Sequence, residues 1–522
     1  MTGADRIVEM LCNLGVRRLF GMPGGGSVSD IIAAAERAGL PFSLAQTETG
    51  SAFMAAAQAE ITGRPGAIVA TLGPGACSAM NGTAHALLDR VPLIVITDCE
   101  GSAQPEGLHQ ALEQAQMFSP VTKFSRRLRV ETAAATFEEI AMAMMDVPPG
   151  PVHIEVSSDF TSAEVDESSP GIFAAPLKAG GTLPASRRPL FLVGLGARNG
   201  LAARAIRRLC EAHGIPALVT YKAKGVVPDD HPWFGGVFTL GALEREIMER
   251  ADLFIGVGLD PVELLPRKWN YAQPVVNVTE WAMQQTQIPF TLELEGDLCG
   301  TLESLEGLPV KSDWDAAEVA ELAEAQRAKM RIAGGSGSLL PHRVVELTAE
   351  AWRGARATVD AGAHMFPVMS LWPALEPNSV LISNGLATMG FALPAAIGAA
   401  LLDKTQPVVA FTGDGGLLMC LGELRTAARE AVRVRVIVFD DNFLSLIRIK
   451  QLQRNYPVES TFNGDVDWAQ VGAGLGIPAR EVRTESELRT ALAESRDYPG
   501  PLLIAAKITA DTYPATIRAL RG

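Results

Sequence analysis

The feature that most constrains this 522-residue chain is a repeated alternation of short apolar runs with helix-like segments. Residues 66–73 and 92–98 are continuous β-rich runs, and a helix-like stretch at 51–61 precedes them. Runs without polar alternation are typical of parallel strands that helices cover on both faces. The sequence therefore predicts an α/β fold built from doubly wound parallel sheets.

The alternation occurs in three blocks. A chain of this length is too long for a single hydrophobic core, so several domains are expected. A segment rich in Pro, Gly and Ser at 161–188 follows the first block, and an Ala- and Glu-rich stretch at 311–332 follows the second. The first and third blocks have similar rhythms, as in a duplicated fold. We expect three domains, at 1–163, 185–310 and 338–522.

The composition argues against several classes of function. The formal net charge of −14 is unsuited to a nucleic-acid partner, because a phosphate backbone requires a basic surface. The cysteines include no CxxC pair, so their spacing supports neither a zinc site nor a disulfide framework. The N-terminal segment does not have the pattern of a secretory signal, and no long apolar run is present. We expect a cytoplasmic protein without nucleic-acid or membrane partners.

The middle block contains a glycine-rich turn at 194–198, directly after a predicted strand. Such a turn can bind a nucleotide phosphate. It has only two glycines and no matching acidic partner, so a tight turn without a ligand is the favoured interpretation.

The third block contains a richer turn at 412–424, where a strand runs into Gly413, Asp414, Gly415 and Gly416 and then into a helix. Glycines let backbone N–H groups approach a phosphate, and a carboxylate supplies a hard oxygen ligand for magnesium. Taken alone, a turn of this type is more often a structural turn than a metal site, so a second ligand is needed to favour the metal site.

A second carboxylate, Asp441, follows the next strand, 27 residues after Asp414. Neighbouring parallel strands would bring both carboxylates to the same sheet edge, where a cation would offset their repulsion. The alternative is that residues 440–442 form a solvated turn.

This spacing resembles the metal and diphosphate motif of thiamine diphosphate-dependent enzymes. Further segments resemble the acetolactate synthase branch in order and spacing, so the chain is identified by resemblance as a member of the acetolactate synthase/2-oxo acid decarboxylase superfamily. The resemblance implies pyrimidine-binding, central and diphosphate-binding domains. The matching segments are 21–31, 47–66, 71–97, 120–124, 150–156, 360–364 and 382–401.

The resemblance also implies roles for particular residues. Glu48 would hydrogen-bond the aminopyrimidine ring nitrogen and so promote formation of the thiazolium carbanion; a capping Glu at the start of helix 51–61 is the alternative. Gly25, His109 and Gln110 would belong to the catalytic side of the site. His109 replaces a Phe of the family, and it is either a proton donor or a structural residue.

The resemblance implies residues for the diphosphate half of the cofactor site in the same way. The carbonyl of Ala387 would accept the cofactor's amino group, and Met389 would hold the cofactor in its bent form, although Met389 could simply be core. Asp414, Asp441 and the carbonyl of Phe443 would bind Mg²⁺. His364 would lie near the diphosphate, or it is instead a capped, solvated residue. The residues expected around the diphosphate are Gly362, His364, Gly413, Gly415, Gly416, Leu444, Ser445 and Leu446.

Several positions depart from the branched-chain biosynthetic pattern. Thr47 and Thr49 flank Glu48 where the family has His and Gln, residues 258–264 read GLDPVEL where the family has GARFDDR, and Lys450 replaces an expected Trp. Asp441 stands at the position where the family usually has an Asn metal ligand, as in catabolic acetolactate synthases. These changes put the substrate and a structural flavin (FAD) in doubt.

We therefore expect thiamine diphosphate- and Mg²⁺-dependent decarboxylation of a 2-oxo acid followed by carboligation. A decarboxylase or related C–C lyase without ligation is the second hypothesis. Two others are a non-catalytic thiamine diphosphate-binding homologue and a flavin- or nicotinamide-dependent oxidoreductase. The resemblance implies a homo-oligomer with active sites at the dimer interface.

Overall fold

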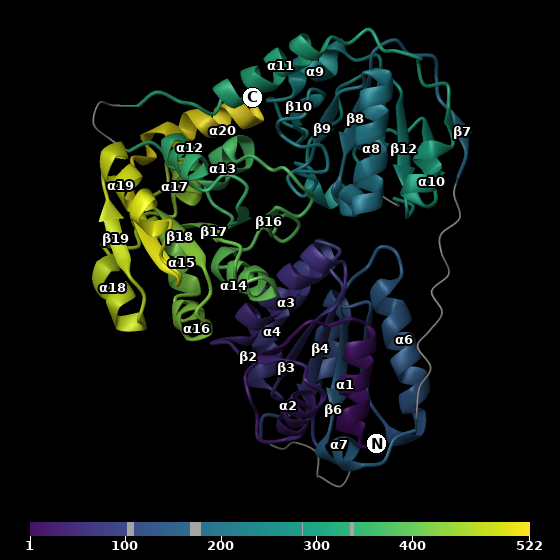
Figure 1. The fold of residues 1–522 in the computed structure, drawn as a ribbon, viewed down its shortest axis with the longest axis vertical. Helices are drawn as coiled ribbons and strands as arrows, with labels where there is room; N and C mark the ends of the chain where they lie inside the picture. Colours follow the sequence, from purple (N-terminus) through teal and green to yellow (C-terminus); the bar gives the residue numbers. More distant parts are fainter. Residues whose placement is uncertain (102–108, 167–178, 284–285, 335–338) are drawn as a thin grey trace. The chain divides into compact units, whose positions relative to one another are not determined.

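The computed structural model describes residues 1–101, 109–166, 179–283, 286–334 and 339–522 (Figure 1). They form two compact units. The first comprises Met1–Ala174, Leu393–Gln406 and Cys420–Val432, and the second comprises Ala175–Ala392, Pro407–Met419 and Arg433–Gly522. The units contain three six-stranded sheets in which all strand pairs are parallel, so the predicted α/β class is confirmed.

The first unit contains the sheet with strand order β2-β1-β3-β4-β6-β5. Alternate residues of each strand face opposite sides: Ala67 and Val69 join the core formed with helices α1, α2 and α6, while α3 and α4 also contact the sheet. The elements are α1 (Gly3–Asn13), β1 (Leu19–Gly21), α2 (Ser27–Ala38), β2 (Phe42–Leu44), α3 (Glu48–Thr62), β3 (Gly66–Ala70), α4 (Pro74–Leu88), β4 (Leu93–Asp98), α5 (Gln114–Phe118), β5 (Phe124–Arg127), α6 (Ala133–Met145), β6 (Val152–Val156) and α7 (Ser158–Ser162).

Two later helices complete this unit. Helix α14 (Ala392–Leu402) packs closely on α3, since a Cβ at Gly398 would collide with the carbonyl of Met54. Helix α16 (Glu423–Glu430) supplies Glu423, whose Oε1 accepts the N–H groups of Gln46 (3.0 Å) and Thr47 (3.2 Å). The segment that leads into α3 is therefore held by a distant part of the chain.

The second unit begins with the central sheet, whose strand order is β10-β9-β8-β11-β12-β13. The order reverses between β8 and β11, as in dinucleotide-binding folds. The stretch expected to separate domains at 311–332 contains helix α11. The elements are β7 (Gly181–Thr182), β8 (Pro189–Val193), α8 (Gly200–His213), β9 (Ala217–Val219), β10 (Phe234–Val237), α9 (Arg245–Arg250), β11 (Leu253–Val257), β12 (Val275–Thr279), β13 (Leu292–Glu295), α10 (Leu298–Glu303), β14 (Leu305–Glu306) and α11 (Ala316–Ala328).

The third sheet, also in the second unit, has the order β16-β15-β17-β18-β20-β19. When the strands of each sheet are numbered from that sheet's own first strand, the third sheet has the same strand order as the first. The similar rhythms of the two blocks predicted this likeness. Its elements are α12 (Pro341–Ala351), β15 (Arg356–Val359), α13 (Met365–Leu371), β16 (Val380–Ile382), β17 (Val408–Gly413), α15 (Asp414–Met419), β18 (Val434–Asp440), α17 (Ser445–Gln453), α18 (Trp468–Leu475), β19 (Ala479–Val482), α19 (Glu485–Ser495), β20 (Leu502–Lys507) and α20 (Tyr513–Arg521).

The segments predicted as linkers lie partly outside the described residues, at 167–178 and 335–338. Among the residues that the structure describes, no helix combines the length and apolar character needed to cross a membrane.

Candidate functional site

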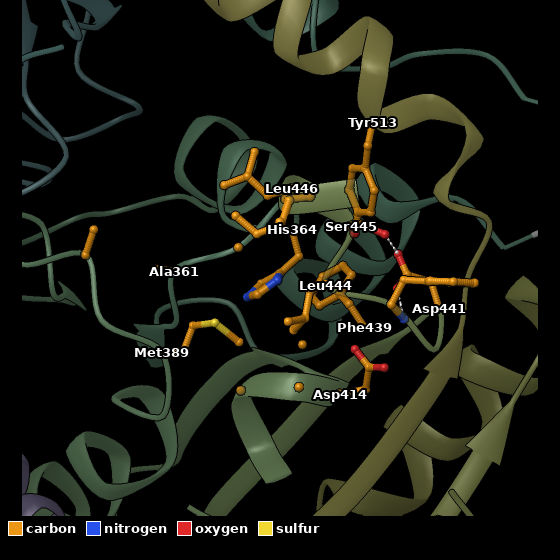
Figure 2. A pocket seen from close by; sticks show the side chains of 18 residues that line it. Ala361, His364, Met389, Asp414, Phe439, Asp441, Leu444, Ser445, Leu446 and Tyr513 are labelled. Atoms are coloured by element: carbon orange, nitrogen blue, oxygen red, sulfur yellow. Dashed lines mark hydrogen bonds between the residues drawn. The ribbon is translucent and has the colours of Figure 1, made fainter. Parts of the chain in front are cut away.

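The loops at the carboxyl edge of the third sheet surround a cavity of about 190 Å³, shown from close by in Figure 2. The cavity brings together every residue that the sequence assigned to the diphosphate half of a site. Their individual roles stay predictions. These residues are Gly362, His364, Ala387, Met389, Gly413, Asp414, Gly415, Gly416, Asp441, Phe443, Leu444, Ser445 and Leu446.

The two candidate metal ligands follow neighbouring strands. β17 ends at Gly413, and Asp414 begins helix α15; β18 ends at Asp440, and Asp441 comes next. The strands pair in parallel with Gly413 opposite Phe439, so their carboxyl ends lie side by side as the sequence predicted. Both carboxylates line the same cavity.

Both carboxyl groups resist ionisation in this setting. Burial raises the pKa of Asp414 to about 7; the charge of Asp441 adds to the rise, while a hydrogen bond from Asn463 opposes it. Burial also raises the pKa of Asp441 to about 6, against hydrogen bonds from Ser445 Oγ (2.6 Å) and the Phe443 N–H (3.0 Å). A divalent cation between these oxygens would offset both effects, and carboxylate oxygen is the ligand that Mg²⁺ prefers.

Asn463 belongs to this site although the sequence analysis missed it. Its Nδ2 donates to Asp414 Oδ2 (3.2 Å), 49 residues away along the chain. The loop that carries it is pinned to the segment after β18, because the Leu444 N–H donates to the Thr461 carbonyl and the Asn463 N–H to the Asn442 carbonyl, both at 2.8 Å. The sequence signal here is an Asn-Gly pair at 463–464, which predicts a turn and nothing about a ligand.

His364 offers a neutral polar group to the cavity. It is buried and stacks on Phe439, with ring centroids 5.2 Å apart and an interplanar angle of 21°. Burial lowers the pKa of its imidazole to about 3, so the ring is uncharged at neutral pH. Its Nε2 has no hydrogen-bond partner among the described residues. A buried nitrogen of this kind is suited to an oxygen of a bound ligand.

The loop that carries Ala387 and Met389 is held in an unusual conformation. Ala387 has a φ of 52°, which is strained for a residue with a Cβ and persists where the surroundings determine it. Asp360 organises the end of this loop: it accepts the N–H groups of Phe391 and Ala392, both at 2.7 Å. The same carboxylate also accepts the hydroxyl of Thr412 on β17 (2.6 Å). Asp360 lies in the 360–364 motif, but the residues around it in the sequence do not indicate this positioning role.

Met389 and Leu444 approach Gly415 closely. A Cβ at Gly415 would lie 2.6 Å from Leu444 Cδ2, 3.0 Å from Asn463 Nδ2 and 3.4 Å from Met389 Cε, so a side chain here would displace its neighbours. The first turn of α15 therefore presents bare backbone next to the cavity.

Tyr513, the first residue of α20, also lines the cavity and was not predicted. Its phenol is buried, and burial raises its pKa well above the usual range, with the charges of Asp441 and Asp414 adding to the rise. No local pattern around Tyr513 indicates this position, because the tertiary fold alone brings α20 to the cavity.

Glu48 lies in the first unit, at the first residue of α3. Thr47 caps the helix, with its Oγ1 accepting the Gly50 N–H (2.9 Å), so Glu48 is not the capping residue. The side chain is buried, with 7% of its surface exposed, rather than at the surface. A Cβ at Gly75 would lie 2.9 Å from Glu48 Oε1, so the start of α4 makes room for this carboxyl group.

Gln110 lies beside the same β3–α4 turn, because a Cβ at Gly73 would collide with the Gln110 carbonyl. Gln114 fixes the turn, accepting the Gly73 N–H (3.2 Å) and donating to the Asp98 carbonyl (2.9 Å). The structure thus places Glu48 and Gln110 at one turn. His109 and Gly25 are exposed, and no described contact assigns either of them a role.

Comparison with known proteins extends over all three sheets. Models of thiamine pyrophosphate enzymes match the chain in three parts: the N-terminal TPP binding domain at residues 1–117, the central domain at 178–305 and the C-terminal TPP binding domain at 360–506.

Full-length relatives include proteins of two kinds. The chain is 28% identical to the acetolactate synthase isozyme 1 large subunit of Escherichia coli (strain K12), over 98% of this chain and 95% of that protein. It is 29% identical to the catabolic acetolactate synthase of Raoultella terrigena, over 96% and 94%. It is 28% identical to a probable 2-ketoarginine decarboxylase of Pseudomonas aeruginosa, over 97% and 93%.

The three domain models match in the order in which the three sheets follow one another, and together they cover most of the chain. The chain belongs to the thiamine pyrophosphate-dependent enzymes that act on C–C bonds, and it is acetolactate synthase-like.

Proposed function

We propose that this enzyme decarboxylates a 2-oxo acid and ligates the product to a second carbonyl compound, in the manner of an acetolactate synthase. The observation that carries the proposal is the cavity of the third sheet, where two buried carboxylates, the glycine backbone that lines the cavity and a neutral His364 converge. The similarity to acetolactate synthases over nearly the whole chain supports the same activity.

The residues of the cavity fit a diphosphate held through a cation. Asp414, Asp441 and the carbonyl of Phe443 would hold Mg²⁺, whose charge would favour the ionised carboxylates despite their raised pKa values. His364 Nε2 and the backbone at Gly415 would bind phosphate oxygens. Thiamine diphosphate bound there would supply the nucleophilic carbon that the decarboxylation of a 2-oxo acid requires.

Glu48 would act on the pyrimidine half of the cofactor. Its buried carboxyl group would hold a proton at the aminopyrimidine ring nitrogen, and the surrounding helix starts would exclude water from it. The carbonyl of Ala387 would accept the cofactor's amino group, since the loop conformation that presents it is held by Asp360.

A screen of 2-oxo acids tests the reaction. The full chain, with thiamine diphosphate and MgCl₂, is incubated with each acid, and carbon dioxide release and product mass are measured together. We expect a product that contains two substrate skeletons less one carbon dioxide. A product with a single skeleton would instead establish the second candidate, a 2-oxo acid decarboxylase, which the similarity to a probable 2-ketoarginine decarboxylase favours. No carbon dioxide from any acid would contradict both.

Substitution of Glu48 tests its assigned role. Glu48→Gln keeps the size of the side chain but cannot hold the ring proton, so we expect turnover to fall by more than about a hundredfold. Thiamine diphosphate binding, measured by calorimetry, should persist because the diphosphate residues are unchanged. The control is Glu36→Gln, an exposed glutamate of α2. Normal turnover by Glu48→Gln would contradict the role.

We also propose a homo-oligomer in which Glu48 of one subunit and Asp414 of another complete each site. The resemblance to the family supports this arrangement. Glu48→Gln and Asp414→Asn chains, each inactive alone, should regain about a quarter of wild-type activity when unfolded, mixed and refolded, because one site in each mixed dimer is intact. If both halves came from one chain, mixing would restore nothing.

A further inference from the structure

The carboxyl edge of the central sheet is crossed by its own chain. We define the strap as residues 258–265, which follow β11. The Gly196 N–H, after β8, donates to the Gly258 carbonyl (2.9 Å), and the Leu265 N–H donates to the carbonyl of Thr239, beyond β10 (3.1 Å). The strap therefore runs back from β11 across the ends of β8, β9 and β10, over the point where the strand order reverses.

Glu263 is the residue of the strap that faces this point. Its Oε2 accepts the N–H of Leu195, in the turn after β8, at 2.8 Å. Its Oε1 accepts the hydroxyl of Thr220, directly after β9. One carboxylate therefore ties together the ends of two strands and the strap.

The turn after β8 and the strap are in contact, with no room between them for a further group. A Cβ at Gly194 would lie 2.5 Å from the Gly258 carbonyl oxygen and 2.9 Å from Glu263 Oε2. Even one added carbon would collide with the strap, and a diphosphate is far larger.

The chemistry of the contact is that of an anion site. In doubly wound sheets with this strand order, N–H groups of the glycine-rich turn after the first strand bind the diphosphate of a dinucleotide. Here the corresponding N–H, on Leu195, already has a carboxylate acceptor from the same chain. Burial raises the pKa of Glu263 to about 8, because it disfavours the charged form, while the hydrogen bonds that Thr220 and Leu195 donate oppose the rise.

We propose that Glu263 takes the place of a dinucleotide phosphate in the central domain, and that this domain binds neither a flavin nor a nicotinamide dinucleotide. The residues present thus do not fit the structural flavin that the resemblance to acetolactate synthases raises. The proposal is independent of the reaction at the third sheet.

Two measurements on the full-length holoenzyme, with thiamine diphosphate and MgCl₂, test the ligand part. An absorbance spectrum of the denatured protein should show no released flavin, and calorimetric titration with FAD, with NAD⁺ and with ADP should show no saturable binding. Flavin in stoichiometric amount, or saturable binding of any of the three probes, would overturn the proposal. Carbon dioxide release by the same preparation reports on the proposed reaction separately.

Three variants test the role of the side chain. Glu263→Ala removes the acceptor of both donors, so we expect the melting temperature to fall by several degrees, and formate should restore part of the loss by occupying the vacated position. Glu263→Gln retains an oxygen that can accept the Leu195 N–H and gains an N–H group that can donate to the Thr220 hydroxyl. Its melting temperature should therefore fall less than that of Glu263→Ala. Glu321→Gln, an exposed glutamate of α11, is the control for loss of charge and should respond to formate as the wild type does. A Glu263→Ala protein as stable as the wild type, or one that formate does not stabilise, would overturn the role of Glu263.

Discussion

The carboxyl edges of the central and third sheets are built from similar parts but end in opposite arrangements. Each edge has acidic residues after parallel strands, and burial raises the pKa of Glu263 at one edge and of Asp414 and Asp441 at the other. At the central edge, backbone and hydroxyl donors of the same chain take both oxygens of Glu263. At the third edge, two carboxylates share a cavity with His364 Nε2, which has no partner among the described residues.

The comparison shows that strand order alone does not make a binding site. The reversal in strand order places loops of both sheets where ligands can bind. A ligand is required only where the chain leaves buried polar groups without an internal partner, because an unsatisfied buried group costs free energy. In the central domain, the strap supplies hydrogen-bond partners from within the fold. At the edge of the third sheet, His364 Nε2 has no such partner among the described residues.

Asp414→Asn should produce the largest effect, because it removes one of the two carboxylates proposed to hold the cation. We expect Mg²⁺-dependent activity to fall by more than about a hundredfold. The measurement is the steady-state rate over a range of MgCl₂ concentrations, with thermal unfolding to check the fold. Asp497→Asn, an exposed aspartate before β20, is the matched control. Wild-type dependence on Mg²⁺ in the Asp414→Asn protein would remove the contrast between the two edges.

Asn463→Ala should have an intermediate effect. The side chain touches Asp414 rather than the proposed cation, and loss of such a supporting hydrogen bond typically lowers metal affinity by about 10- to 100-fold. We expect a higher MgCl₂ concentration for half-maximal activity, with kcat recovered at saturation. A fall in kcat that saturating MgCl₂ does not reverse would show that Asn463 does more than position Asp414.

Glu263→Gln should have the smallest effect on activity, less than about twofold, because Glu263 lies outside the residues proposed to bind the cofactor.

The effect of Glu263→Gln on stability should depend on pH. The folded pKa of Glu263, about 8, exceeds the ordinary value of 4.5, so its contribution to the free energy of unfolding is complete below pH 4.5 and lost as the pH rises through about 8. Denaturant unfolding across this window should show the wild type losing stability relative to the variant. A difference that stays constant with pH would contradict the buried setting of the carboxyl group.

The sequence predicted the long inner strands better than the edge strands. β3, β4, β17 and β18 are mainly apolar because helices cover them on both faces, although β18 also contains the buried Arg435. Several outer strands have mixed polar sequences, such as FSRR at β5, LELE at β13 and AREV at β19, which resemble loops until a neighbouring strand pairs with them. Their assignment depends on contacts that no local pattern encodes.

The candidate site divides in the same way. Asp414 and Asp441 could be paired from the sequence because each follows a strand and parallel neighbours end at one edge. Asn463, Tyr513 and the positioning role of Asp360 could not, because their contacts join segments that are distant along the chain.

By itself, the sequence determined the fold class, the family and the motif residues, because strand periodicity and turn chemistry are local properties that neighbouring residues encode. Only the tertiary structure decided which carboxyl edge presents an open cavity and which is closed by its own strap. That outcome depends on where Glu263 meets Leu195 and Thr220, 68 and 43 residues away along the chain. Contacts of such separation leave no periodic signal in a single sequence, since they are formed by packing rather than by local conformational preference.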